Sequence, residues 1–177
     1  HSCWTALPIY KIDNVIIEAS SHGLHQKRLD KLNIKAGIFT NFTQDHLDYH
    51  KTMNSYFQAK MILFSKLLRE KKHVIADKSI KQFSRLKKIS IRKKLKIKDI
   101  SELLVQTENM NLPLVGSFQF KNLSMAILAA KLCNVNYFKI KKALIKITNI
   151  DGRLDLIKKF SDNRKIFIDY AHTPDAL

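Results

Sequence analysis

Residues 36–76 read AGIFTNFTQDHLDYHKTMNSYFQAKMILFSKLLREKKHVIA, and this stretch decides the fold class. It begins with a short apolar segment, residues 36–40, and ends with another, residues 73–76, and both are typical of buried strands. Between them, apolar side chains recur every three or four residues over 52–70, which predicts an amphipathic helix. A strand, a helix and a strand in succession predict an α/β fold built on a mostly parallel sheet flanked by helices.

The same alternation extends to both sides of this stretch. We expect a further buried strand over residues 14–20, and helices over 117–132 and 137–148, the first capped by Ser117. The remaining expected elements are less regular. They are short β segments at 87–91 and 102–107, two strands at 154–160 and 165–169, and a turn at 171–174 that opens a last helix.

The chain is strongly basic, with 32 Lys and Arg against 15 Asp and Glu. Ten of the basic residues lie between positions 78 and 98, where no acidic residue occurs. Such a run is typical either of a solvated face or of a module that binds polyanions. Most of the charge is Lys rather than Arg, and Phe83 is the one aromatic residue in the run, so we expect no nucleic-acid partner.

Composition also bears on whether the chain enters a membrane and on the redox state of its compartment. Apolar runs are only a few residues long, which predicts no membrane insertion and no signal peptide. Cys3 and Cys133 are far apart and form no metal-binding pattern, which fits a reducing compartment such as the cytoplasm. Because the first residue is His1 rather than Met, we expect the chain to begin inside a larger protein.

Polar clusters follow the predicted strands, where open parallel sheets bind ligands. The first runs from Glu18 to Arg28 and the second from Thr40 to His50, with two Asp and two His in its last six residues. Carboxylate and imidazole groups together can bind a divalent ion. The alternatives are an ion pair between Glu18 and Arg28 in the first cluster, and Asp residues that only cap turns in the second.

Two further clusters suit a nucleotide. The stretch from Gly116 to Asn122 stands at a predicted helix start, where amide groups favour anions, and Gln119 and Asn122 can share a face. Arg153 can meet a phosphate, and Asp169, which ends a predicted strand, can accept hydrogen bonds from ribose hydroxyls. The alternatives are ordinary helix capping and an Arg–Asp pair. No phosphate-cradling glycine loop is present in the sequence.

Five motifs in this order resemble the Mur ligase family: EASSHGLHQKR (18–28), FTNFTQDHLDYH (39–50), AK (59–60), GSFQFKN (116–122) and DYAHTPDAL (169–177), with GR (152–153) before the last. The first and last are similar to the member that adds the third amino acid of the peptidoglycan stem peptide. The resemblance implies an ATP-dependent ligase that joins meso-diaminopimelate or L-lysine to UDP-MurNAc-L-Ala-D-Glu. The run of EASSHGLHQKR argues against the close alternative, folylpolyglutamate synthetase.

The resemblance also implies a role for each matching residue. Glu18, His46 and Lys60 are expected to form the catalytic magnesium site, with Lys60 carrying a carbamate. The UDP-MurNAc-dipeptide is expected to contact Ser20, Gln26 and Arg28. ATP is expected to contact Asn122, Arg153, Asp169 and Gln119, although Gln119 stands where the family usually has Asn. His172 lies in the family's hinge-side motif.

The resemblance further implies how the chain is divided. Residues 1–150 are expected to be the central ATP-binding domain, truncated at its N-terminus, and residues 151–177 the start of a Rossmann-like C-terminal domain. We expect the phosphate loop and the uridine-binding domain upstream of His1 and the rest of the C-terminal domain downstream of Leu177. On this view the chain has no ligase activity alone.

Overall fold

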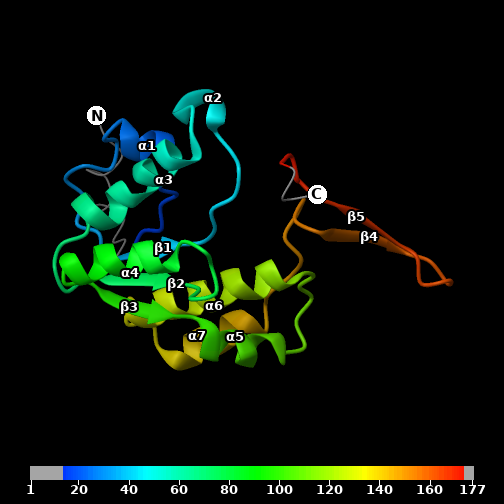
Figure 1. Cartoon of the computed structure of the whole chain (residues 1–177). Helices are drawn as coiled ribbons and strands as arrows, with labels where there is room; N and C mark the ends of the chain where they lie inside the picture. The colour runs from blue at the N-terminus through cyan, green and yellow to red at the C-terminus, as the bar shows by residue number, and fades with distance from the viewer. Residues whose placement is uncertain (1–13, 174–177) are drawn as a thin grey trace, which may run out of the picture.

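Three parallel strands form the sheet that the sequence predicts, in a computed structural model that describes residues 14–173 (Figure 1). β1 (Ala36–Phe39) pairs with β2 (His73–Ala76), and β2 pairs with β3 (Lys96–Asp99). β2 is therefore central, and β3 has β2 as its one neighbour among the described residues. Because all three strands run the same way, their carboxyl ends lie along one rim of the sheet, where such folds bind ligands.

Helices cover both faces of the sheet, which confirms the predicted α/β layering (Figure 1). One face is covered by α1 (Ser21–His25), α3 (Met53–Ile62), its π-helical continuation η2 (Leu63–Leu67) and α4 (Phe83–Arg92). The other face is covered by α6 (Ser117–Leu132), with α5 (Ser101–Glu108) and α7 (Tyr137–Leu144) packed beside it. None of the helices described is long and apolar enough to span a membrane.

The core has two parts because alternate residues of a strand point to opposite faces. Val74 and Ala76 of β2 pack against α3 and α4, in a cluster that includes Phe57, Phe64 and Leu86. Ile75 points the other way and packs with Met125 of α6 and Ile100. Burial of β2 on both sides explains why Val74, Ile75 and Ala76 are all apolar.

The helix predicted over residues 52–70 is present but changes pitch. Thr52 caps α3 by accepting a hydrogen bond from the Ser55 amide, and the helix widens to a π-helix at Leu63. η2 lies very close to β1, since a side chain added at Gly37 would come within 2.9 Å of Phe64 Cε1. The absence of a Cβ at Gly37 therefore lets the helix pack directly on the strand.

Three of the predicted strands are wrong. Residues 14–20 are extended but pair with no strand among the described residues, and Ile16 is 95% exposed. Residues 87–91 and 102–107 lie in helices α4 and α5, because apolar side chains at Phe83, Leu86 and Ile89 recur at helical rather than strand spacing. The third strand of the sheet is instead β3, whose alternating lysines concealed it in the sequence.

The two strands predicted near the C-terminus form an antiparallel hairpin, β4 (Asp155–Lys159) with β5 (Lys165–Ile168). The hairpin extends away from the helices and the main sheet (Figure 1). Two predicted helix limits are also corrected: Gly116 rather than Ser117 is the N-cap of α6, and α7 ends at Leu144. The helix expected after residue 174 lies outside the described residues, and the domain boundary at residue 150 stays a prediction.

Candidate functional site

Lys60 lies within electrostatic range of Glu18 and shares a contact with the Tyr56 ring with His46, which belongs to the loop after β1, although 42 positions separate Glu18 from Lys60. The Nζ of Lys60 lies 5.1 Å from the centre of the Tyr56 ring, and the His46 ring lies 5.7 Å from the same ring. The carboxylates of Asp45 and Glu18 are close enough to act on the charge of Lys60. Tyr56 and Asp45 therefore join the predicted residues in this cluster.

The amine of Lys60 lies in a desolvated place rather than in free solvent. Burial lowers the pKa of Lys60 from its usual value, and the negative charges of Asp45 and Glu18 oppose this effect only in part. Burial likewise raises the pKa of Tyr56 to about 12, so this phenol stays protonated at neutral pH. The lowered pKa increases the fraction of Lys60 present as a neutral, nucleophilic amine.

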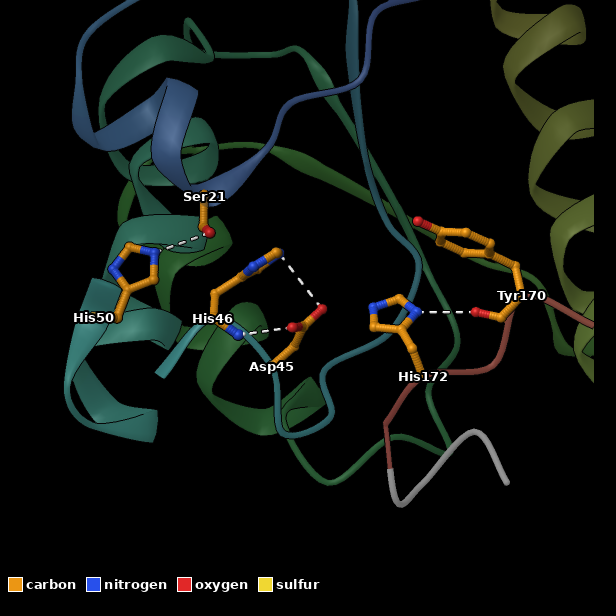
Figure 2. A network of polar contacts seen from close by, with 6 residues as sticks. All are labelled: Ser21, Asp45, His46, His50, Tyr170 and His172. Atoms are coloured by element: carbon orange, nitrogen blue, oxygen red, sulfur yellow. Dashed lines mark hydrogen bonds and ion pairs between the residues drawn. The ribbon is translucent and has the colours of Figure 1, made fainter. Parts of the chain in front are cut away.

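The backbone at His46 takes an unusual conformation that directs this side chain. His46 has φ 55° and ψ 27°, in the left-handed region, immediately before the short helix α2 (Leu47–His50). Asp45 stabilises the turn, since its Oδ1 accepts a hydrogen bond of 2.7 Å from the His46 amide (Figure 2). The other carboxylate oxygen lies 3.4 Å from His46 Nε2. Several other turns of the described chain contain a non-glycine residue with positive φ, so this conformation orients His46 but does not by itself indicate function.

The residues predicted to contact the dipeptide substrate lie on and after α1. Ser20 is its N-cap, and its Oγ accepts a hydrogen bond of 3.1 Å from the Gly23 amide. Gln26 and Arg28 follow the helix and expose their side chains. Among the described ion pairs none joins Glu18 to Arg28, so the alternative explanation of the first cluster finds no support. Glu18 and Arg28 thus have no ion-pair partner within residues 14–173.

Magnesium prefers oxygen donors in a near-octahedral arrangement, so carboxylates suit it better than the imidazole of His46. Within residues 14–173, no three His, Cys, Asp or Glu side chains converge closely enough to hold a metal ion by themselves. Glu18 and Asp45 provide carboxylates near Lys60, but a protonated amine at that point repels a cation. These residues fit a magnesium ion when Lys60 bears an anionic group instead of an ammonium.

The start of α6 lies at the same rim, held there by a buried ion pair. Lys121 Nζ lies 2.7 Å from Oδ2 of Asp77, the residue that follows β2. Gln119 is buried, and its Nε2 donates a hydrogen bond of 2.7 Å to the Arg153 carbonyl. Its Oε1 has no partner among the described residues and can accept a hydrogen bond from a ligand. Asn122 is exposed one turn further along the helix.

Acid titration tests the role of Asp77. Burial alone would raise the pKa of this carboxyl, but hydrogen bonds from Lys121 and Ser79 outweigh burial, so the pKa is lowered from its usual value of 3.8. A lowered pKa in the folded state stabilises the fold above about pH 4 and is lost as the pH falls through the folded-state pKa. We expect Asp77→Asn to reduce the free energy of unfolding by roughly 1–3 kcal/mol at pH 7 and by less at pH 3.

Urea titrations of the 177-residue chain at both pH values measure this difference. Asp99→Asn is the matched control, because Asp99 pairs with Lys78 at 3.5 Å in a more exposed position. If Asp77→Asn lowered the free energy of unfolding by the same amount at pH 7 and pH 3, the charge of Asp77 would not stabilise the fold.

The last two predicted ATP contacts meet at the base of the hairpin. Asp169 follows β5 directly, as predicted, and its Oδ2 accepts a hydrogen bond of 2.7 Å from the Leu154 amide. The guanidinium of Arg153 lies over the Tyr170 ring, 5.0 Å from its centre. His172 Nδ1 donates to the Tyr170 carbonyl over 2.9 Å (Figure 2). The hydrogen bond from Gln119 to Arg153 connects this base to α6.

Three residues of the described rim are not among the predicted site residues: Tyr56, Asp77 and His50. Tyr56 occupies an apolar position of the helix, and its place four residues before Lys60, on the same face, is the signal that could have identified it. Asp77 directly follows the strand at residues 73–76, and nothing else in the sequence distinguishes it. His50 belonged to a polar cluster, but nothing in its spacing indicates that it is buried.

Comparison with known proteins identifies the family. Residues 5–130 match the Mur ligase middle domain. A Rickettsia montanensis protein named UDP-N-acetylmuramoyl-L-alanyl-D-glutamate–2,6-diaminopimelate ligase is 35% identical over 187 residues, which cover 94% of this chain and 38% of that protein. Proteins of the same name from Leptospira interrogans and Clostridium tetani are 37% and 31% identical, with the same shares covered.

The chain thus spans less than two fifths of the length of these relatives. The matched residues contain the three-stranded sheet, the predicted metal-site residues Glu18, His46 and Lys60, and the helices on both faces of the sheet up to residue 130; α7 and the hairpin lie beyond the match. On the combined evidence of fold, rim and sequence similarity, the chain belongs to the Mur ligase family.

Proposed function

We propose that the chain is the central part of an ATP-dependent ligase that adds the third amino acid to UDP-MurNAc-L-Ala-D-Glu during bacterial peptidoglycan synthesis. The observation that carries the proposal is the gathering of Glu18, His46 and Lys60 at the rim of a Mur ligase sheet. The names of the similar proteins favour 2,6-diaminopimelate over L-lysine as the amino acid. The reaction is assigned to a protein of the relatives' full length, in the cytoplasm.

The reaction brings several anions together. The carboxylate of the UDP-MurNAc-dipeptide attacks the γ-phosphate of ATP, which gives an acyl phosphate and ADP. The amine of the incoming amino acid then displaces phosphate and forms the amide bond. Both steps need positive charge and fixed donors around the transferred phosphoryl group. Glu18 and a carbamate on Lys60 would offer oxygen donors to a magnesium ion, with His46 as the third predicted ligand, and the ion would supply that charge.

Lys60 can acquire the carbamate because of where it lies. Its lowered pKa favours the neutral amine, which combines with carbon dioxide. The product is an anion with two oxygen atoms, which are the donors that magnesium prefers. This change replaces the repulsive ammonium in the cluster with a metal ligand, and the flanking Tyr56 ring holds the side chain in place.

The remaining predicted residues divide between the two larger substrates. Ser20, Gln26 and Arg28 surround α1 and offer a hydroxyl, an amide and a guanidinium to the dipeptide and its sugar phosphate. For ATP we assign Gln119, Asn122, Arg153 and Asp169. The free Oε1 of Gln119 supports this assignment, because a buried acceptor without a partner suits a ligand amine.

The function is tested by assaying amide formation in a full-length protein that contains this chain. With ATP, magnesium and UDP-MurNAc-L-Ala-D-Glu, we expect product with diaminopimelate and at least tenfold less with L-lysine. A folate with glutamate is the control substrate for the folylpolyglutamate synthetase alternative. Turnover of the folate alone, or binding to DNA that weakens steeply with salt and no ligation, would contradict the proposal.

A further inference from the structure

The segment at α1, assigned to the dipeptide substrate, and the segment at α2, which leads to Lys60, must keep a fixed position relative to each other. α1 follows Ser20, which we assign to the substrate, while α2 follows His46 and leads into α3 with Lys60. α1 has only five residues, and so short a helix has little stability of its own. Its position must therefore come from contacts with the rest of the fold.

His50, the last residue of α2, connects these elements. Its Nε2 lies 2.9 Å from the Oγ of Ser21, the first residue of α1 (Figure 2). Its ring stacks on Tyr56 of α3, with 5.4 Å between ring centres and 25° between planes. Tyr56 in turn contacts Lys60, so a continuous path of contacts runs from α1 through His50 to Lys60.

The hydrogen bond between His50 and Ser21 is buried, unlike the other hydrogen bond between α1 and α2. His50 is 7% exposed and Ser21 is 2% exposed, so water cannot replace either partner of the hydrogen bond. A second bond between the two segments joins His25 Nδ1 to the Tyr49 hydroxyl, also over 2.9 Å, but it lies at the surface. Loss of the buried bond therefore costs more than loss of the exposed one.

We propose that His50 is a positioning residue, which fixes α1 and its substrate contacts against the helix that carries Lys60. The inference rests on the proposed function, because it concerns how the UDP-MurNAc-dipeptide is placed relative to the reacting phosphate. His50 acts through Ser21 and Tyr56 and does not itself touch a reactant. Its effect should therefore fall on binding of this substrate and leave binding of ATP unchanged.

The test uses the full-length ligase with three variants. His50→Phe keeps the ring that stacks on Tyr56 but loses the hydrogen bond, whereas His50→Gln retains a donor and an acceptor. Ser21→Ala removes the hydroxyl partner of His50. We expect His50→Phe and Ser21→Ala to raise the KM for UDP-MurNAc-L-Ala-D-Glu about tenfold, with the KM for ATP unchanged within about twofold. His50→Gln should recover most of the loss. The double variant should be no worse than either single variant, because both remove one bond.

Ser90→Ala is the matched control, since Ser90 is an equally buried serine whose Oγ donates to the Leu86 carbonyl within α4. A residue that only stabilises the fold reduces kcat through the folded fraction and leaves both KM values unchanged. Three results would overturn the inference. The first is a lower kcat with both KM values unchanged, the second is an equal change in both KM values, and the third is strictly additive losses in the double variant. If His50→Phe does not fold, Ser21→Ala and His50→Gln decide the question by the same criteria.

Failure of this inference is distinguishable from failure of the proposed function. A wild-type protein that forms no amide contradicts the function itself. A wild-type protein that forms the amide, with Ser21→Ala showing an unchanged KM for the dipeptide substrate, contradicts only the role of His50. Amide hydrogen exchange gives a second readout, in which residues 21–25 of His50→Phe should exchange about tenfold faster while α6 is unaffected.

Discussion

Replacement of Lys60 by alanine should reduce the ligase activity of the full-length protein by a factor of about 100 or more. The variant loses both the amine that accepts carbon dioxide and the anion that would complete the magnesium site with Glu18 and His46. Lys60→Arg should be equally inactive, because a guanidinium keeps the positive charge and forms no stable carbamate. The measurement is amide formation under saturating ATP and dipeptide substrate.

Two controls separate the chemistry from general damage. Lys66→Ala, in the same helical segment but on an exposed side chain, should keep its activity within about twofold. Added bicarbonate should not restore Lys60→Ala, since no amine remains to react. Mass analysis of the intact wild type, or its crystal structure, should reveal the added carbon dioxide. Normal turnover in Lys60→Ala would exclude any catalytic part for this residue.

Truncation of Phe64 should produce the largest loss of stability, about 3–5 kcal/mol for Phe64→Ala. The side chain is 1% exposed, and its ring lies 6.1 Å from that of Phe39 on β1. Its ring also comes closest to the space left by the missing side chain of Gly37, with Leu63 of η2 and Leu68 beside it, so its loss removes the nearest contact between η2 and the strand. The residual cavity adds to the lost transfer free energy.

Urea unfolding of the 177-residue chain gives this difference directly. Phe138→Ala provides the comparison, because Phe138 lies on α7 and is 77% exposed, so its removal should change stability by less than about 0.5 kcal/mol. Similar losses in both variants would mean that the cluster around Phe64 is not the core of the sheet.

The central strands and the long helices were predictable from sequence because both faces of the sheet are covered. Burial on two sides leaves short apolar runs such as residues 73–76, and α6 shows the apolar spacing of a packed helix. β3 was not predictable from an apolar run, since Lys96 and Lys98 alternate with its other residues. Residues 14–20 have the composition of a strand, but pairing depends on a neighbour and not on composition.

The site was predictable only through family resemblance. The sequence shows that Glu18 and His46 follow apolar segments. It does not show on which side of its helix Lys60 lies, because the side that faces the site depends on how α3 packs against β1. Helical periodicity relates Lys60 to Tyr56, and the contacts of Tyr56 with His46 then close the cluster. Burial of His50 against Ser21 involves two segments 29 residues apart, which no local pattern reveals.

The lysines of β3 also affect how separate molecules meet. An unpaired strand border is a template for adding strands from other chains, which leads to aggregation. Lys96 and Lys98 project from this border and belong to a chain with a net charge of +17. Two copies that approach along β3 repel each other, and they do so most strongly in dilute salt, where the repulsion is least screened. Within residues 14–173, where β3 has no neighbour beyond β2, the lysines that hid the strand from prediction thus disfavour the addition of a second copy at this border.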